Sequence, residues 1–432
     1  MRLTVLEQRE IRVGACADGR TSTLSHDHAG ALVDLAERMG ARFVAWQSPT
    51  SLRIQQFVGF VRAGDLQLEI LPKLDTLSDH PNIRQSLLGM LAVTHDLEVR
   101  PSDSAGFSES EEPFIAALAR LYCRRLLDAI RRGLKQDYVL RQDCLPHVRG
   151  KIDWPAQAVS QAKQTLEFNC IFDERSENTL LNQTLKAALL AAGSLLEGTR
   201  IASVVNELRY AMAGVVDVVP APEPVKRLRT DRTNQHLRPL LALAKLILGN
   251  CNPDLGRAAQ GNRNVYSVVW DMNVLFEEYV GRLATRVLSA KGFAVDLQDR
   301  GSLYLAREAK GNQNAFLLKP DIVVREGTKP WAVIDTKWKV LDPQKANLGV
   351  SEADVYQVLA YAHRYETNLA VLVFPHRGAL GPAGVQKEFL IDGGRGNTVR
   401  VRVSTLDLAR LESVTGQLER GLIHERRETR AG

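Results

Sequence analysis

The sequence lacks several patterns that place proteins in well-known classes. It has no run of about twenty apolar residues, the length that spans a bilayer, although 45% of its 432 residues are hydrophobic. Its opening stretch, MRLTVLEQREIRVG, has no apolar block of the signal-peptide kind. No G-x-x-x-x-G-K-[ST] phosphate loop occurs, nor any internal repeat. We therefore expect a soluble, cytoplasmic protein with no membrane partner and no nucleotide-hydrolysing loop of its own.

Metal-binding and disulfide patterns are also missing. The five cysteines form no C-x-x-C pair, so we expect reduced thiols in the core rather than a zinc site or a disulfide framework. They are Cys16, Cys123, Cys144, Cys170 and Cys251. His26 and His28 could ligate a metal in principle. Nothing near them has metal-site spacing, so an ordinary polar surface loop is the better interpretation.

Length and charge set the next limits. A chain of 432 residues predicts two or three domains with ample apolar content to bury. The net charge of +6 permits a nucleic-acid partner without demanding one. Residues 111–260 hold 21 Lys and Arg against 16 Asp and Glu, which makes this middle portion a candidate docking surface.

The first 110 residues predict a β-rich domain. In residues 57–74, FVGFVRAGDLQLEILPKL, apolar Leu66, Leu68 and Ile70 alternate with polar residues after a turn, which indicates a hairpin with one buried face. Residues 28–40 have helical spacing and end at a glycine, a plausible helix cap.

The middle portion, residues 111–262, changes to helical spacing. Residues 111–138, 178–196 and 234–249 predict three helices, with a proline-rich loop before the last of them. The stretch HVRGKIDWPAQ interrupts them and suggests a local turn. The arginines of the first helix either contact phosphate or form a solvated face. A Gly- and Asn-rich boundary then precedes residues 263–432.

Charged residues stand at the ends of two apolar runs in residues 318–339, LKPDIVVREGTKPWAVIDTKWK. The runs predict two strands joined by a turn. Because strand side chains alternate with a period of two, Asp335 and Lys337 project to one face while Thr336 points away. Pairing of the strands can bring Asp321 beside Asp335. Two carboxylates and an ammonium group would then converge.

Two converging carboxylates need a cation, and hard oxygen ligands favour Mg²⁺, or Mn²⁺, over zinc. Such a metal polarises a phosphodiester oxygen and lowers the pKa of a bound water. Lys337 could orient that water and stabilise charge on phosphoryl oxygens. The acid motif alone is expected by chance in roughly one chain in ten of this length. Its weight therefore depends on the flanking helices.

The helix predicted upstream, over residues 270–293, supplies a third carboxylate. Its apolar stripe runs through Met272, Phe276, Tyr279, Leu283 and Val287. Glu277 lies at the edge of that stripe, whereas Glu278 points almost oppositely. Glu277 is either a further group of the site or an ordinary surface glutamate.

The helix predicted downstream, over residues 351–366, begins at Ser351 as N-cap. Gln357 and Tyr361 are four residues apart and share one face. They either tie the helix to the sheet or hold a DNA strand or a metal-bound water. Residues 368–375, NLAVLVFP, return as a core strand.

The order of these motifs resembles the PD-(D/E)xK nuclease superfamily and, over nearly the whole chain, the McrC family, the nuclease subunits of McrBC modification-dependent restriction systems. The resemblance rests on VGFVRAGDLQLEILPKL, VRGKID, FDERSENTLLNQTLKAAL, MNVLFEEYV, LKPDIVV, IDTKWK and ADVYQVLAYAHRY in this order. It implies a multidomain α+β fold. Residues 1–110 would form a β-rich partner-docking domain, residues 111–262 a helical stalk, and residues 263–432 an α/β endonuclease domain with a mixed central sheet.

The resemblance also implies roles and partners. Asp321, Asp335 and Lys337 look like the nuclease triad, Glu277 like a third metal ligand, and Gln357 like a group that supports the substrate or the site. The family acts on double-stranded DNA with a separate ring-forming, hexameric AAA+ GTPase, McrB, which recognises modified DNA. Such a chain would be an Mg²⁺-dependent endonuclease active only with that partner, whose hydrolysis it stimulates.

Two other functions remain open from the sequence. The chain could be chiefly an adaptor that activates a nucleotide hydrolase without cutting DNA. It could also be a stand-alone repair or recombination nuclease of the same superfamily.

Overall fold

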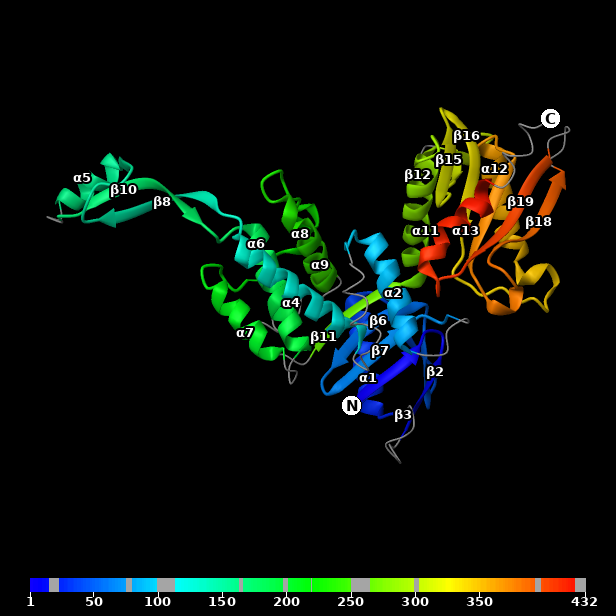
Figure 1. Ribbon diagram of the computed structural model, residues 1–432, viewed down its shortest axis with the longest axis horizontal. Coiled ribbons are helices and arrows are strands. Elements are labelled where there is room, and N and C mark those ends of the chain that lie inside the picture. Colours follow the sequence, from blue (N-terminus) through cyan, green and yellow to red (C-terminus); the bar gives the residue numbers. More distant parts are fainter. Residues whose placement is uncertain are drawn as a thin grey trace. The chain divides into compact units, whose positions relative to one another are not determined.

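The structure is a computed structural model of the 432-residue chain. It describes residues 1–14, 23–74, 80–98, 113–162, 166–196, 201–218, 220–249, 265–298, 303–392 and 398–423. The chain divides into two compact units, one formed by Met1–Phe114 with Val269–Gly432 and the other by Ile115–Val268 (Figure 1). These unit boundaries lie within a few residues of the predicted ones, and the predicted first and last domains fall in one unit. The division into three domains stays a prediction.

Hydrogen bonds between distant residues hold the two chain segments of the first unit together. The indole Nε1 of Trp338 donates to Oε1 of Glu7 over 2.8 Å, and both side chains are buried. The backbone N of Met272 donates to the carbonyl of Gln56 at 2.9 Å. The start of the chain is therefore packed directly against the segment that follows Asp335 and Lys337.

The first segment of this unit supplies the sheet β3-β2-β5-β4 and three strands of the sheet β1-β7-β6-β11, whose β11 (Val265–Asp271) comes from later in the chain. Its elements are β1 (Arg2–Leu6), β2 (Glu10–Val13), β3 (Thr23–Leu24), α1 (His26–Met39), β4 (Val44–Ser48), β5 (Ser51–Ile54), β6 (Phe57–Ala63), β7 (Leu66–Leu71) and α2 (His80–Thr94). The predicted β6–β7 hairpin is confirmed, as is the helix α1, which ends at Gly40 in the left-handed region with φ 64°.

The expectation that β7 buries only one face is wrong. Glu69, on the face expected to meet water, is 1% exposed. Its carboxylate accepts hydrogen bonds from Arg84 of α2, at 2.6 and 3.0 Å, and from the backbone N of Phe114 at 2.8 Å. A buried carboxylate needs such partners, because charge is costly to remove from water. The helix α2, which the sequence analysis did not predict, covers this second face.

The second unit holds most of the middle of the chain. Its elements are α4 (Phe114–Arg132), β8 (Asp137–Leu145), β9 (Lys151–Ile152), α5 (Trp154–Ala162), β10 (Phe168–Ser176), α6 (Leu180–Leu195), α7 (Ala202–Ala211), α8 (Pro222–Arg227), η1 (Gln235–Leu237) and α9 (Arg238–Gly249). The three predicted helices correspond to α4, α6 and η1 with α9. Strand β11 (Val265–Asp271) then leads into the first unit.

The expected all-helical middle is wrong in one part. Strands β8, β10 and β9 form an antiparallel three-stranded sheet, with β8 paired to β10 over nine residues of each strand. The stretch expected to be a turn supplies β9 and α5 instead. We call residues 137–176 the arm. Figure 1 shows it as a slender extension of the helices of its unit.

The last segment of the first unit is built on a six-stranded sheet in the order β12-β15-β16-β17-β19-β18. Its elements are α11 (Met272–Ser289), β12 (Ala294–Leu297), β13 (Tyr304–Arg307), β14 (Asn314–Leu317), β15 (Ile322–Glu326), β16 (Lys329–Thr336), η2 (Ala346–Gly349), α12 (Glu352–Arg364), β17 (Leu369–Pro375), η3 (Gly378–Leu380), β18 (Gly384–Asp392), β19 (Thr398–Leu406) and α13 (Leu411–Ile423). Strands β16, β17 and β19 run parallel, and the other pairs antiparallel, so the sheet is mixed.

Sequence patterns explain why these elements form. The predicted stripe of α11 is buried throughout, at Met272, Phe276, Tyr279, Leu283 and Val287. In α12, the Ser351 side chain accepts from the backbone N of Asp354, whose side chain accepts in return from the Ser351 backbone. The strand predicted over residues 368–375 is β17, buried on both faces. These parts of the prediction are confirmed.

The positions of some histidine and cysteine residues differ from those expected from the sequence. His26 and His28 lie in the first turn of α1 rather than in a loop, and His28 Nε2 lies 2.8 Å from Asp65 Oδ1. Cys123 and Cys170 are buried free thiols, as expected, but Cys144 is exposed on β8. Cys16 and Cys251 lie outside the described residues. Within the described ranges, no helix combines the length and apolar composition needed to cross a membrane.

Candidate functional site

The site lies where β16 ends, and the strand register brings its two aspartates together. Ile322 of β15 pairs with Ile334 of β16, so the next residues outward, Asp321 and Asp335, stand across from each other. Val333 packs in the core beneath α12, and Asp335 projects to the same face two residues on. Asp335 is 2% exposed. The sheet thus presents a buried carboxylate toward α12.

Lys337 shares this face, as the period of two predicted. Its Nζ lies 2.7 Å from Oδ2 of Asp335 and donates to Oε1 of Gln357 at 3.0 Å. The Lys337 backbone is fixed as well, because its N donates to the carbonyl of Val373 at 2.9 Å. The ammonium group is therefore held between β16 and α12, with a quarter of its side chain exposed.

Gln357 and Tyr361 continue this chain of hydrogen bonds. Gln357 Nε2 donates to the Tyr361 hydroxyl at 2.9 Å, and that hydroxyl donates to the carbonyl of Lys319 at 3.1 Å. Of the roles left open for this pair, tying the helix to the strands is the one these contacts support. Gln357 also orients Lys337, which the spacing alone did not reveal.

Asp321 is held by a residue to which the sequence analysis gave no role. Thr336, between Asp335 and Lys337, donates to Asp321 Oδ2 from both its backbone N, at 2.7 Å, and its hydroxyl, at 2.8 Å. The threonine does alternate away from the face of its neighbours, yet it reaches Asp321 across the strand end. A donor-bearing residue inside the D-x-K motif was the available signal.

Glu277 approaches from α11. Its Oε1 accepts from Gln298 Nε2 at 2.9 Å, and Gln298 in turn donates its backbone N to the carbonyl of Asp321 at 2.7 Å. Glu277 feels the charges of both Asp321 and Asp335. Gln298, which follows β12, is a second supporting residue that the sequence analysis missed. No local sequence signal marks it, because its position depends on the pairing of β12 with β15.

Asp335, Asp321 and Glu277 lie close together in a partly buried site, and the ionised form of each carboxyl is disfavoured. Burial, reinforced by the charge of Asp321 and partly offset by Lys337, raises the pKa of Asp335 to about 6. Burial also raises the pKa of Asp321, against the two Thr336 hydrogen bonds. Burial and then the charge of Asp321 raise the pKa of Glu277. A cation added among them would relieve this cost.

The neighbouring carboxylates, Asp335 above all, stabilise the charged form of Lys337. Burial by itself lowers the pKa of the ammonium group, but the charge of Asp335 and the hydrogen bond to it outweigh burial, so the pKa is raised. Lys337 is therefore charged at neutral pH. A charged donor held in place is what stabilisation of a phosphoryl oxyanion requires.

The donor set fits a hard divalent cation. Every candidate ligand is a carboxylate oxygen, and among the residues that the structure describes the buried Oδ2 of Asp335 has no partner other than Lys337. Within the part of the chain that the structure describes, no three acidic, histidine or cysteine side chains are grouped closely enough to hold an ion as they stand. Asp321 and Glu277 point instead to Thr336 and Gln298, so an ion would exchange these hydrogen bonds for its own.

The chain is similar to known proteins in sequence and in fold. The sequence matches the family described as "McrBC 5-methylcytosine restriction system component" over residues 52–375. No curated protein matches the chain.

Two solved structures have a similar fold. One is a chain of a half-complex from a tetradecameric assembly of Thermococcus gammatolerans McrB AAA+ hexamers with bound McrC. It has a TM-score of 0.71 at 20% identity, covering 98% of this chain and 100% of that one. The other is a chain of the McrBC complex of the same organism. Its TM-score is 0.51 at 21% identity, covering 67% of this chain and 88% of that one.

Proposed function

The chain belongs to the family of McrBC 5-methylcytosine restriction system components, and we propose that it is the Mg²⁺-dependent DNA endonuclease subunit of such a system. The observation that carries this proposal is the ion pair of buried Asp335 with Lys337 at the end of β16, with Asp321 on the adjacent strand end and Glu277 beside it. Hydrolysis of a phosphodiester is the reaction for which this donor set is suited. On this proposal the segment Val269–Gly432 is a PD-(D/E)xK nuclease domain.

Each residue has a distinct task in the proposed mechanism. Asp321, Asp335 and Glu277 would hold Mg²⁺, or Mn²⁺ in its place. When bound, that ion would polarise the scissile phosphate and acidify a water. Lys337 places a positive charge where negative charge develops on phosphoryl oxygens. Gln357 is a positioning residue, because it contacts Lys337 and keeps its ammonium group directed at the strand end.

The proposal includes a partner, because the sequence has no phosphate loop of its own. One of the similar structures is an assembly of McrB AAA+ hexamers with bound McrC. We propose that this chain likewise binds an AAA+ GTPase hexamer and stimulates its hydrolysis. The partner would recognise methylcytosine-containing DNA, and this chain would cut it. Such a complex acts in the cytoplasm against foreign DNA.

Reconstitution tests the proposal. The full chain and an McrB-type AAA+ GTPase are mixed with methylated and unmethylated plasmid, with GTP and either Mg²⁺ or a chelator. We expect cleavage only of methylated DNA, and only with both proteins and Mg²⁺ present. If the chain cleaves DNA without any partner, it is a stand-alone nuclease. Stimulated GTP hydrolysis without cleavage under every metal tried would show the non-cleaving adaptor, and would overturn the nuclease assignment.

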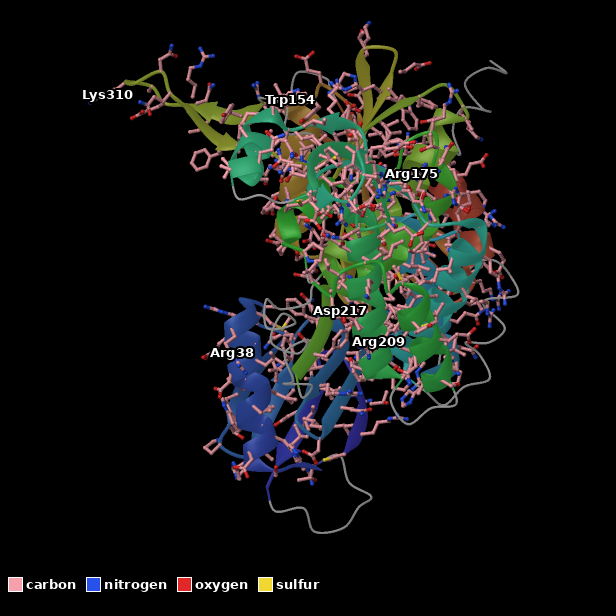
Figure 2. All side chains as sticks on the ribbon, turned by 90° about the vertical axis from the view of Figure 1, so that its left-hand side faces the viewer. Arg38, Trp154, Arg175, Arg209, Asp217 and Lys310 are labelled. Carbon is pink, nitrogen blue, oxygen red and sulfur yellow. The ribbon has the colours of Figure 1, made fainter. Side chains whose placement is uncertain are left out.

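Two surfaces are candidates for docking the partner. The family resemblance assigns docking to residues 1–110, where the large side chain of Trp46 is 44% exposed on β4. The arm offers more exposed apolar surface: Tyr138, Leu140, Val148, Trp154 and Leu166 are all half exposed or more. Exposed apolar clusters of this kind commonly mark protein interfaces. Figure 2 shows Trp154 at one end of the arm.

The two exposed tryptophans make a matched pair of variants for docking. If residues 1–110 and the arm both bind the partner, Trp46→Ala and Trp154→Ala each weaken partner binding by about tenfold, the range for a buried interface tryptophan. Stimulated GTP hydrolysis at limiting chain concentration measures the effect. If only Trp154→Ala lowers the stimulated GTP hydrolysis, the partner docks on the arm and not on residues 1–110.

Point substitutions suit this question better than deletion of residues 1–110. That deletion would remove Glu7, which holds the buried indole of Trp338 directly after Lys337. It would also remove Gln56, which accepts hydrogen bonds from Met272 and Asn273 at the start of α11. Lost activity in a deletion variant would then confound docking with folding of the nuclease site. Neither exposed tryptophan makes such a buried contact.

A further inference from the structure

Beside the six-stranded sheet stands a separate hairpin. Among the described strands, β13 and β14 pair only with each other, and a short loop, residues 308–313, joins them. In Figure 2, Lys310 marks the outer end of this hairpin, which extends away from the ribbon around its base. The hairpin contributes little to the core, since most of its residues are exposed. Its sequence therefore needs another explanation.

The base of the hairpin is anchored to the proposed nuclease site. The backbone N of Leu318 donates to the carbonyl of Leu303 at 2.9 Å, closing the hairpin, and Leu318 is buried in the core beneath α12. From α12, Arg364 Nε donates to the carbonyl of Tyr304 at 2.9 Å. Lys319, at the exit, accepts the hydroxyl of Tyr361, which belongs to the Gln357–Lys337 chain of hydrogen bonds. The hairpin thus ends four residues before Asp321.

One face of the hairpin combines apolar and basic side chains in water. Arg307 pairs with Asn314, and the same register sets Leu305 across from Phe316. Leu305 is 46% exposed and Phe316 73% exposed, although hydrophobic burial would favour hiding both. Phe316 also adopts φ 60°, a left-handed conformation that costs an aromatic residue free energy. Strained, exposed aromatic residues of this kind concentrate at binding sites.

The charges of the hairpin point to an anionic occupant. Arg307, Lys310 and Lys319 are exposed, and among the described residues none of them has an ion-pair partner. Glu308 is the single acid between residues 303 and 320. An apolar wedge flanked by unpaired cations suits a nucleic-acid groove, where cations meet phosphates and apolar side chains press on sugars and bases.

We infer that the β13–β14 hairpin is a DNA-contacting element that grips the duplex beside the scissile phosphate. Arg307 and Lys310 neutralise backbone phosphates, and Phe316 with Leu305 packs into the groove. This inference rests on the proposed nuclease function, and it adds the surface by which the site would hold its substrate. The anchored base explains how binding at the tip fixes the position of the strand at Lys337.

DNA affinity of the assembled complex tests the inference. The full chain carrying Asp335→Asn, with its AAA+ partner, is titrated with a fluorescent methylated duplex at several salt concentrations. Arg307→Ala and Lys310→Ala are each expected to weaken binding about fivefold and to reduce the slope of log affinity against log salt by about 0.9. Lys329→Ala, which removes an exposed cation at the far end of β16, is the matched control and should leave both unchanged.

Phe316 requires a variant that keeps the backbone. Phe316→Asn removes the ring but suits a left-handed conformation, and we expect about tenfold weaker binding with an unchanged salt slope, the result for lost stacking. Phe316→Tyr keeps the ring and should restore affinity. Unchanged affinity in all hairpin variants would overturn the inference. Lost GTPase stimulation with normal DNA affinity would also overturn it, by assigning the hairpin to the partner.

The proposed function and this inference fail in different ways. If the parent complex neither binds nor cuts methylated DNA, the proposed function fails before any hairpin variant is compared. If the parent complex binds and cuts while the hairpin variants match Lys329→Ala, only the hairpin assignment is wrong.

Discussion

Replacing Asp335 or Lys337 by alanine is expected to abolish DNA cleavage by the complex, with a rate at least about a thousandfold lower. Asp335 is the most buried carboxylate of the site, and Lys337 supplies its fixed positive charge. Asp335→Ala would remove a proposed metal ligand, and Lys337→Ala the charge that stabilises phosphoryl oxygens. Single-turnover cleavage of a methylated plasmid, with partner and GTP in excess, measures the loss.

Stability must be separated from chemistry in these variants, because the two side chains form an ion pair in which Asp335 is buried. Asp335→Asn keeps the shape of the side chain and can still accept a hydrogen bond from Lys337, so it should fold normally. Stimulation of the partner's GTP hydrolysis serves as the assembly readout and should stay within about twofold of the parent. Lys329→Ala, on the same strand, is the control for loss of a lysine.

Two results would contradict the site assignment. One is a variant at either position that still cuts at the parental rate in the assembled complex. The other is rescue of Asp335→Asn simply by raising the partner concentration, which would move the defect from chemistry to docking. If the rate of DNA cleavage falls while stimulated GTP hydrolysis is retained, the defect lies in the cleavage reaction itself.

The strand hairpin that carries the site could be predicted because its signals are local. Apolar runs around a turn fixed β15 and β16, and the period of two put Asp335 and Lys337 on one face. Thr336 carried a local signal, a donor inside the D-x-K motif, but its hydrogen bonds to Asp321 were not predicted. Gln298 was missed because its contacts with Asp321 and Glu277 depend on strand pairing and loop position. These are tertiary features that the order of residues does not display.

The arm escaped prediction for a different reason. A strand is recognised by alternation of buried and exposed residues, yet β8 is exposed at almost every position and so has no apolar period to read. Its partner β10 is only partly buried. The helix α2 was hidden likewise, since it is buried on most sides and lacks one apolar stripe. Both elements lack the single apolar face from which an amphipathic strand or helix is predicted.

A second large effect is expected at Glu7, far from the chemistry along the chain. Its side chain is buried, Oε1 accepts from Trp338 Nε1 at 2.8 Å and from the backbone N of Lys73 at 3.0 Å, and Oε2 has no hydrogen-bond partner within the described ranges. Burial raises the pKa of Glu7 from its ordinary 4.5 to about 7. Folding therefore stabilises the protonated form of this carboxyl.

The sign of the pH effect follows from proton linkage. Below pH 4.5 the carboxyl is protonated in both the folded and the unfolded chain, so burial of charge costs nothing. As pH rises from 4.5 to about 7, the unfolded chain ionises while the folded chain keeps its proton, and the free energy of unfolding falls. Above pH 7 the loss is complete, at about 3 kcal/mol for this difference in pKa.

Glu7→Gln should remove this loss. The amide oxygen can accept both existing hydrogen bonds, and no charge is buried at any pH. Between pH 5 and pH 8 the variant's free energy of unfolding should therefore gain about 2 to 3 kcal/mol relative to the parent. Urea unfolding of the two proteins at both pH values measures this difference, and all other titrating groups cancel in the comparison.

Glu10→Gln on the neighbouring strand β2 is the matched control, because Glu10 is exposed and loses little hydration on folding. If the free energies of unfolding of the parent and Glu7→Gln change with pH in parallel, Glu7 ionises in the folded chain without a cost in stability. That result would contradict the prediction that burial disfavours its charge. Because Trp338 keeps its acceptor in the variant and directly follows Lys337, cleavage should be unchanged. Stabilisation without lost cleavage would show that Glu7 supports the nuclease site through its hydrogen bond, not through its charge.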